Sequence, residues 1–244
     1  MKTFVALLLL LVGPSMAAEP TGVEILDAID ANLSSENRFL RSRMIIHNRR
    51  GERTIESQSW GEGTTRSFTE YLSPPREAGT KMLKLEDHLW TYSPSTDRTI
   101  QISGHMLRQS VMGSDLSYED MMDDADLSSS YDATVEGTEE VDGRVCWKVQ
   151  LEATKPDVAY QSRRMWVDKE RMVPLLQELF GKSGRLLKTM TLSDLQEIYG
   201  RWYPMKSRFK DELKSGEGTE FVIDEIAFDQ DIPDHVFTKA SLRK

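Results

Sequence analysis

Residues 111–127 carry the side chains whose types and spacing best suit ligand binding. Ser117 and Asp120 form a Ser-x-x-Asp pattern, which typically starts a helix. Side chains spaced three and four residues apart then share one apolar face of that helix: Tyr118, Met121, Met122 and Ala125. Because methionine is unbranched and polarizable, such a face can adapt to apolar ligands of varied shape. The alternative is that the face only fills a protein core.

The same segment is rich in carboxylates, which could suggest calcium chemistry. We expect them instead to form the solvated face of the helix: Glu119, Asp120, Asp123, Asp124 and Asp126. They lack the alternating Asp or Asn ligands and the central glycine of a calcium loop. The sequence therefore predicts no metal site here.

No pattern of catalytic residues stands out elsewhere. The four histidines show no pair at helical or zinc-ligand spacing: His47, His88, His105 and His235. The chain lacks a Gly-x-Ser-x-Gly turn and a phosphate-binding glycine loop. The single cysteine, Cys146, is expected to be an unreactive thiol on the polar face of a strand. We expect no enzyme and no cofactor, although a lipid hydrolase with scattered carboxylates stays a weaker alternative.

The N-terminus predicts export. Lys2, the apolar run of residues 4–12 and the small side chains Ser15 and Ala17 have the order of a signal peptide. The run is too short to span a bilayer, so we expect residues 1–17 to be removed. Residues 18–244 are then one domain in a bacterial periplasm, with no intrachain disulfide because there is one cysteine. The formal net charge of -9 argues against a nucleic-acid partner.

The elements that must position the methionine-bearing segment are mostly strands. Thr21 and Glu24 form a capping box for one N-terminal helix that ends near Ser35. From Arg38 onward, short β-prone runs are separated by glycine-containing turns. Strict alternation predicts a half-buried strand with these apolar members: Val145, Trp147, Val149 and Leu151. Residues 165–167 and 174–176 are apolar on both faces, which indicates that each face is covered. We predict roughly ten strands in one curved antiparallel sheet, a mainly β (α+β) protein.

The motif at residues 112–121, Met-Gly-Ser-Asp-Leu-Ser-Tyr-Glu-Asp-Met, resembles the central motif of bacterial outer membrane lipoprotein-sorting proteins. These are relatives of the periplasmic carrier LolA and the acceptor LolB. Shorter matches lie at residues 90–94, at residues 166–168 followed by Pro174, and at residues 232–237. The similarity runs from about Arg38 to the end of the chain.

The resemblance implies an unclosed β-barrel, a strongly bent antiparallel sheet whose hollow is capped by helices and binds acyl chains. It implies a periplasmic carrier or chaperone for lipoproteins or other hydrophobic molecules, working beside an inner-membrane exporter of the resistance-nodulation-division type. The alternative is a sensor or accessory module that docks onto such an exporter. The residues expected to line the hollow or its lid are Trp90, Tyr92, Met112, Tyr118, Met121, Met122 and Trp166.

Overall fold

A computed structural model describes residues 19–48, 51–122, 127–156 and 158–243. The expected signal peptide, residues 1–17, therefore lies outside the described residues, as do Asp123, Asp124, Ala125 and Asp126 of the methionine-bearing segment.

Thirteen strands form one antiparallel sheet in the order β6-β5-β4-β3-β2-β1-β13-β12-β11-β10-β9-β8-β7. The first half of the chain supplies β1 (Asn37–Asn48), β2 (Gly51–Glu62), β3 (Arg66–Ser73), β4 (Lys81–Leu85), β5 (His88–Ser93) and β6 (Arg98–Ile102). The second half supplies β7 (Tyr131–Val141), β8 (Arg144–Ala153), β9 (Ser162–Asp168), β10 (Pro174–Phe180), β11 (Leu186–Ile198), β12 (Arg201–Asp211) and β13 (Gly218–Phe228).

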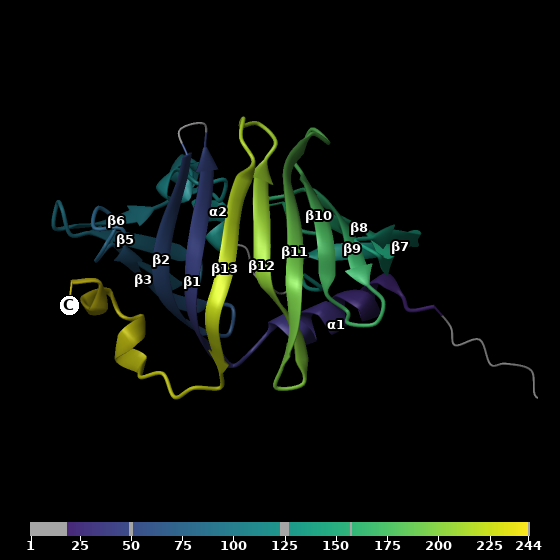
Figure 1. The fold of residues 1–244 in the computed structure, drawn as a ribbon, viewed down its shortest axis with the longest axis horizontal. Helices are drawn as coiled ribbons and strands as arrows, with labels where there is room; N and C mark the ends of the chain where they lie inside the picture. The colour runs from purple at the N-terminus through teal and green to yellow at the C-terminus, as the bar shows by residue number, and fades with distance from the viewer. Residues whose placement is uncertain (1–18, 49–50, 123–126, 157, 244) are drawn as a thin grey trace, which may run out of the picture.

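The sheet consists of two meanders that meet where β1 pairs with β13. Within the described part of the chain, β6 and β7 are edge strands with one neighbour each, so the sheet is not closed. Figure 1 shows β1, β13, β12 and β11 side by side, with β3–β6 and β7–β9 bending away behind them on either side. The predicted mainly β, unclosed antiparallel sheet is confirmed, with more strands than the turn pattern indicated.

The helical elements are short: α1 (Gly22–Leu33), η1 (Gly104–Arg108), η2 (Val111–Gly113), α2 (Tyr118–Met122), η3 (Asp234–Phe237) and η4 (Lys239–Arg243). Helix α1 begins with the predicted capping box, in which the Thr21 amide donates to Glu24 at 2.7 Å and the Glu24 amide donates to Thr21 Oγ1 at 3.3 Å. None of the described helices is long and apolar enough to cross a membrane.

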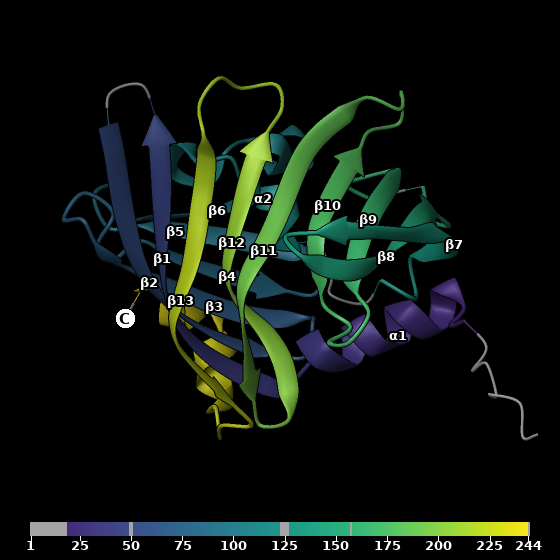
Figure 2. The same ribbon diagram turned by 45° about the vertical axis from the view of Figure 1, so that its right-hand side comes forward.

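One face of the sheet carries both α1 and α2. Residues paired directly across neighbouring strands point to the same face of a sheet. A continuous series of such pairs runs from Met165 of β9, through Gln177 of β10, to Ile46 of β1, so Met165 and Ile46 lie on one face. Ile25 and Ile29 of α1 pack on this face over Met165, whereas α2 packs on it near Ile46. Because both helices lie inside the bend, this is the concave face (Figure 2).

The convex face has its own apolar cover. The C-terminal elements η3 and η4 bring Phe237 and Leu242 onto Phe68, Leu83 and Trp90 of β3, β4 and β5. Farther along the sheet, a separate convex cluster holds Cys146, Trp166 and Leu175. The strands that read as apolar on both faces are therefore covered on both faces, as predicted.

The alternation predicted for β8 holds at three of its four positions. Trp147, Val149 and Leu151 are buried beneath α1, but Val145 is 54% exposed. Cys146, expected on a polar face, is fully buried because Trp166 and Leu175 cover that side. Burial raises the pKa of the Cys146 thiol to about 11, which disfavours the reactive thiolate.

Gly22, the first residue of α1, lies directly against the backbone of β7. A Cβ there would overlap the backbone carbonyl of Ala133, which belongs to a paired strand and has little freedom to move. We expect Gly22→Ala to lower the free energy of unfolding by about 1–3 kcal/mol, as overpacking usually does. Chemical denaturation measures this, with Val23→Ala as the control because Val23 is 55% exposed on the same turn. Equal stability of Gly22→Ala and the wild type would contradict the packing described for α1.

Candidate functional site

After β6, residues 103–122 cross the concave face and contain η1, η2 and α2. Their apolar side chains pack against those of β1–β6: Met106, Leu107, Met112, Leu116, Tyr118, Met121 and Met122 against Met44, Ile46, Ile55, Tyr71, Met82, Leu89 and Ile102. Six of the chain's twelve methionines meet here, and we call them the methionine cluster: Met44, Met82, Met106, Met112, Met121 and Met122. The segment thus places a polarizable apolar surface over the hollow of the sheet.

Local hydrogen bonds start α2 where the sequence predicts. The Ser117 amide donates to Asp120 at 2.6 Å, and the Asp120 amide donates to Ser117 Oγ at 3.3 Å. The helix is only five residues long and has no fully buried residue. Because so short a helix is unstable alone, its side-chain contacts must hold it in place.

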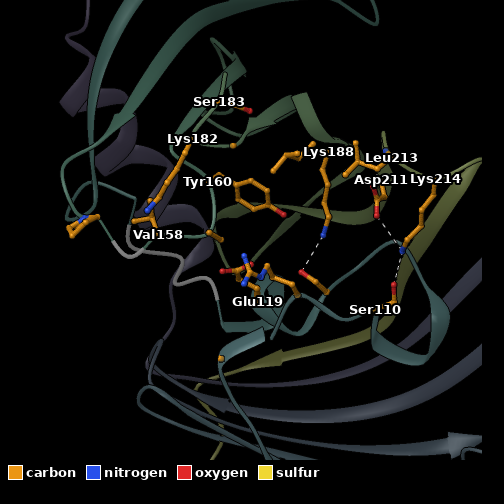
Figure 3. A pocket seen from close by; sticks show the side chains of 17 residues that line it. Ser110, Glu119, Val158, Tyr160, Lys182, Ser183, Lys188, Asp211, Leu213 and Lys214 are labelled. Atoms are coloured by element: carbon orange, nitrogen blue, oxygen red, sulfur yellow. Dashed lines mark hydrogen bonds and ion pairs between the residues drawn. The ribbon is translucent and has the colours of Figure 1, made fainter. Parts of the chain in front are cut away.

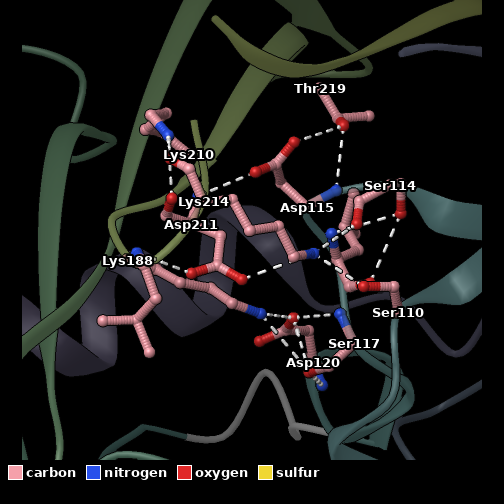
Figure 4. Close-up of polar contacts among 12 residues, drawn as sticks. Ser110, Ser114, Asp115, Ser117, Asp120, Lys188, Lys210, Asp211, Lys214 and Thr219 are labelled. Carbon is pink, nitrogen blue, oxygen red and sulfur yellow. Dashed lines mark hydrogen bonds and ion pairs between the residues drawn. The ribbon is translucent and has the colours of Figure 1, made fainter. Parts of the chain in front are cut away.

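Asp120 supplies an ionic contact of this helix. Its carboxylate forms an ion pair with Lys188 of β11, which rises from the concave face (Figure 4). The same carboxylate accepts a hydrogen bond from the Tyr160 hydroxyl. Both side chains of the pair are nearly enclosed, with 9% of Lys188 and 8% of Asp120 exposed. Burial raises the pKa of Asp120, but Lys188 and the other donors outweigh it and hold that pKa below its usual value. The expectation that Asp120 points into water is therefore wrong.

A second set of polar contacts fastens the segment to β12 and β13. The buried Asp115 carboxylate accepts hydrogen bonds from the Thr219 hydroxyl at 3.0 Å and from the Asp211 amide at 3.1 Å. The Lys214 ammonium donates to Ser110 Oγ at 2.6 Å and to the Ser114 carbonyl at 2.8 Å (Figure 4). The crossing segment is thus held at its polar residues, while its apolar residues face the sheet.

A pocket of about 870 Å³ lies on the polar flank of α2, next to Ser117 and Glu119. Four cationic side chains line it: Arg108, Lys182, Lys188 and Lys214. Figure 3 shows Lys182 on one side and Lys188 and Lys214 on the other. Sequence reasoning missed this pocket, because its residues come from four separate segments and no local pattern connects them.

The structure brings four of the seven predicted site residues together. Met112, Tyr118, Met121 and Met122 all pack on the apolar concave surface. The nearby Arg53 guanidinium donates one hydrogen bond to the Met112 carbonyl and another to the Glu77 carboxylate, the latter at 3.1 Å. These bonds fix the turn that contains Met112.

The three other predicted residues lie on the convex face. Trp90 and Tyr92 pack in the cluster formed with Phe237, and the Lys239 ammonium lies 4.0 Å from the Trp90 ring centroid. The Trp166 indole N–H donates a hydrogen bond to the Glu139 carboxylate of β7 at 2.8 Å. In β5 the residue next to Trp90, Leu89, faces the concave side. We expected Trp90, Tyr92 and Trp166 to share a hollow with the methionines, but the structure places them on the opposite face of the sheet.

The residues that the structure describes include no group of three or more His, Cys, Asp or Glu side chains arranged to hold a metal ion. Around the methionine cluster the concave face offers apolar contacts, and the neighbouring pocket offers hydroxyl and cationic groups.

Comparison with known proteins places this geometry among related folds. The family model that matches the chain, over residues 63–244, is described as "Uncharacterized protein". A DUF1329 family protein from Desulfovibrio piger is similar with a TM-score of 0.82 and 24% identity, over 91% of this chain and 97% of that one. None of the curated proteins matches the sequence.

Two further solved structures carry names that refer to lipoprotein sorting. A LolA superfamily protein from Nitrosomonas europaea has a TM-score of 0.74 and 25% identity, and the match covers 91% of this chain and 100% of that one. A candidate outer membrane lipoprotein-sorting protein domain from Vibrio parahaemolyticus has a TM-score of 0.79 and 21% identity, over 91% and 98%.

Proposed function

The chain belongs to the family whose model matches residues 63–244 and has the fold of LolA superfamily proteins, and on this basis we propose that it is a carrier or chaperone for acyl chains. The cargo in this proposal is a lipoprotein or another lipid, and the acyl chain lies on the concave face against the methionine cluster. The protein acts by binding and release and needs no catalytic group.

The observation that carries the proposal is the methionine cluster itself. Met44 and Met82 belong to the sheet, whereas Met112, Met121 and Met122 belong to the crossing segment, which polar contacts at Ser110 and Asp120 help to hold. A core that only had to be stable would favour side chains with fewer rotamers, because flexible methionines specify packing poorly. Methionines between a sheet and a short helix suit an interface that must repack around a guest.

The energetics of acyl transfer fit such a site. Removing each methylene from water contributes about 0.8 kcal/mol, so roughly ten methylenes contribute about 8 kcal/mol without any polar contact. Affinity of this kind depends little on the identity of the cargo. Release then requires a state of lower affinity, which displacement of α2 or a partner protein would supply.

The location and partner extend the same proposal. Residues 1–17 have the order of a signal peptide, which favours action in the periplasm. An inner-membrane exporter is the partner that the family resemblance favours, as the source or the receiver of the cargo.

Native mass spectrometry of the protein purified from a bacterial periplasm tests the proposal. We expect a mass shift that corresponds to a bound acyl-containing molecule and disappears after delipidation. Adding back a long-chain fatty acid should restore a stoichiometric complex. A protein that is ligand-free when isolated and binds no acyl chain on addition would contradict the proposed function.

A further inference from the structure

We propose that the pocket beside α2 binds the phosphate headgroup of an anionic amphiphile whose acyl chain lies against the methionine cluster. This inference rests on the proposed function and names the class of lipid that the site prefers. It concerns the pocket of about 870 Å³, a volume typical of sites for small ligands.

The charge around the pocket differs from that of the chain as a whole. The chain has a formal net charge of -9, yet the pocket is lined by four cationic side chains and by two carboxylates, Glu119 and Asp211. Lys188 is paired with Asp120, and Lys214 lies 3.3 Å from Asp211. The pocket therefore presents an excess of positive charge in an acidic protein.

Two of the cations are available for a ligand. Arg108 in η1 and Lys182 in the β10–β11 turn are exposed, and neither forms an ion pair with the residues that the structure describes. A guanidinium fork and an ammonium are the groups that commonly bind phosphate oxygens. Hydroxyl groups of Ser117, Ser183 and Tyr160 line the same space. Those of Ser117 and Tyr160 donate to Asp120, so Ser183 is the one of the three whose hydroxyl can donate to a phosphate oxygen.

The position of α2 relates the pocket to the methionine cluster. One flank of this helix places Met121 and Met122 against the apolar concave surface, whereas the other flank places Glu119 at the pocket. Since a helix with its side chains is about 10–12 Å across, a headgroup in the pocket and a chain in the cluster are within the reach of one lipid. Leu187 and Leu213 add apolar contacts inside the pocket for the first carbons of the chain.

The test compares three probes by isothermal titration below their critical micelle concentrations. Tetradecanoyl lysophosphatidic acid and tetradecanoyl monoglyceride share a chain and differ in the phosphate, and glycerol 3-phosphate lacks the chain. We expect the phosphate-bearing lipid to bind wild type about tenfold more tightly than the monoglyceride, and glycerol 3-phosphate to bind far more weakly than either.

The variant Arg108→Gln/Lys182→Gln should lose this preference, with Kd for lysophosphatidic acid rising about tenfold and Kd for the monoglyceride unchanged. The matched control is Arg76→Gln/Arg98→Gln, which removes two exposed charges away from the pocket and should bind both lipids as the wild type does.

Three results would overturn the inference in distinguishable ways. If the pocket variant binds lysophosphatidic acid as the wild type does, the headgroup lies elsewhere, while intact monoglyceride binding leaves the proposed function standing. If glycerol 3-phosphate binds as tightly as the lipid, the pocket is a site for free phosphate. If the wild type binds neither lipid, the proposed function fails together with the inference.

Discussion

Replacing Lys188 with methionine is expected to lower the free energy of unfolding by about 3–5 kcal/mol, because it leaves a buried carboxylate without its counter-ion. Asp120 would keep the Ser117 and Tyr160 donors but lose the only cation that pairs with it among the described residues. Urea denaturation at neutral pH measures the loss. The double variant Asp120→Asn/Lys188→Met removes both charges and should recover most of it, since the cost comes from the unpaired charge.

The same pair gives a pH dependence whose sign follows from Asp120. Its pKa is lowered in the folded protein, so the pair stabilises the fold above the usual carboxyl pKa of about 3.9, and the stabilisation is lost as the pH falls through the folded value. Wild type should therefore lose more stability than the double variant between neutral pH and about pH 3. Parallel stability curves for the two proteins, or an unaltered stability of Lys188→Met, would show that this pair does not hold α2 in place.

Replacing Met121 with aspartate is expected to weaken binding of a fluorescent long-chain fatty acid about a hundredfold. A carboxylate in an apolar site costs several kcal/mol if it stays charged, and a factor of ten in affinity corresponds to about 1.4 kcal/mol. The fold should survive, because Met121 is only partly buried and α2 has no fully buried residue. Fluorescence titration measures affinity, and circular dichroism checks the fold.

Two controls make the Met121 result specific. Met121→Leu conserves the apolar volume and should bind within a few-fold of the wild type. Trp90→Phe alters an aromatic residue of the convex face and should leave affinity unchanged. A folded Met121→Asp protein with wild-type affinity would show that α2 does not line the ligand-binding site. An unfolded one would favour the alternative in which the methionine cluster is only a core.

Short sequence patterns predicted the structural features that depend on interactions between neighbouring residues. The Thr21 and Ser117 caps set the starts of α1 and α2, and alternation identified Trp147 to Leu151 as a half-buried strand. The resemblance added the unclosed sheet. The helix starts and the alternation of β8 depend on residues a few positions apart, so a single sequence contains the information.

The faces of the strands and the partners of buried charges depend on contacts between residues far apart in the sequence. Leu89 and Trp90 are adjacent, apolar and buried, and strand pairing together with the packing of the C-terminal Phe237 and Leu242 places Trp90 on the convex face. Asp120 reads as a solvated carboxylate until Lys188 of β11, 68 residues later, is placed beside it. Period-two alternation separates the two faces of a strand but does not say which face is concave.

Photo-crosslinking tests the central claim, that acyl chains bind on the concave face, most directly. A fatty acid with a diazirine near its terminal methyl group would be irradiated in complex with the wild-type protein, and the labelled peptides would be mapped by mass spectrometry. We expect labels in the segment that contains Met121 and Met122 and in the β1 segment that contains Met44. Labels confined to the C-terminal segment around Phe237, or to the convex side of β9 at Trp166, would contradict the account.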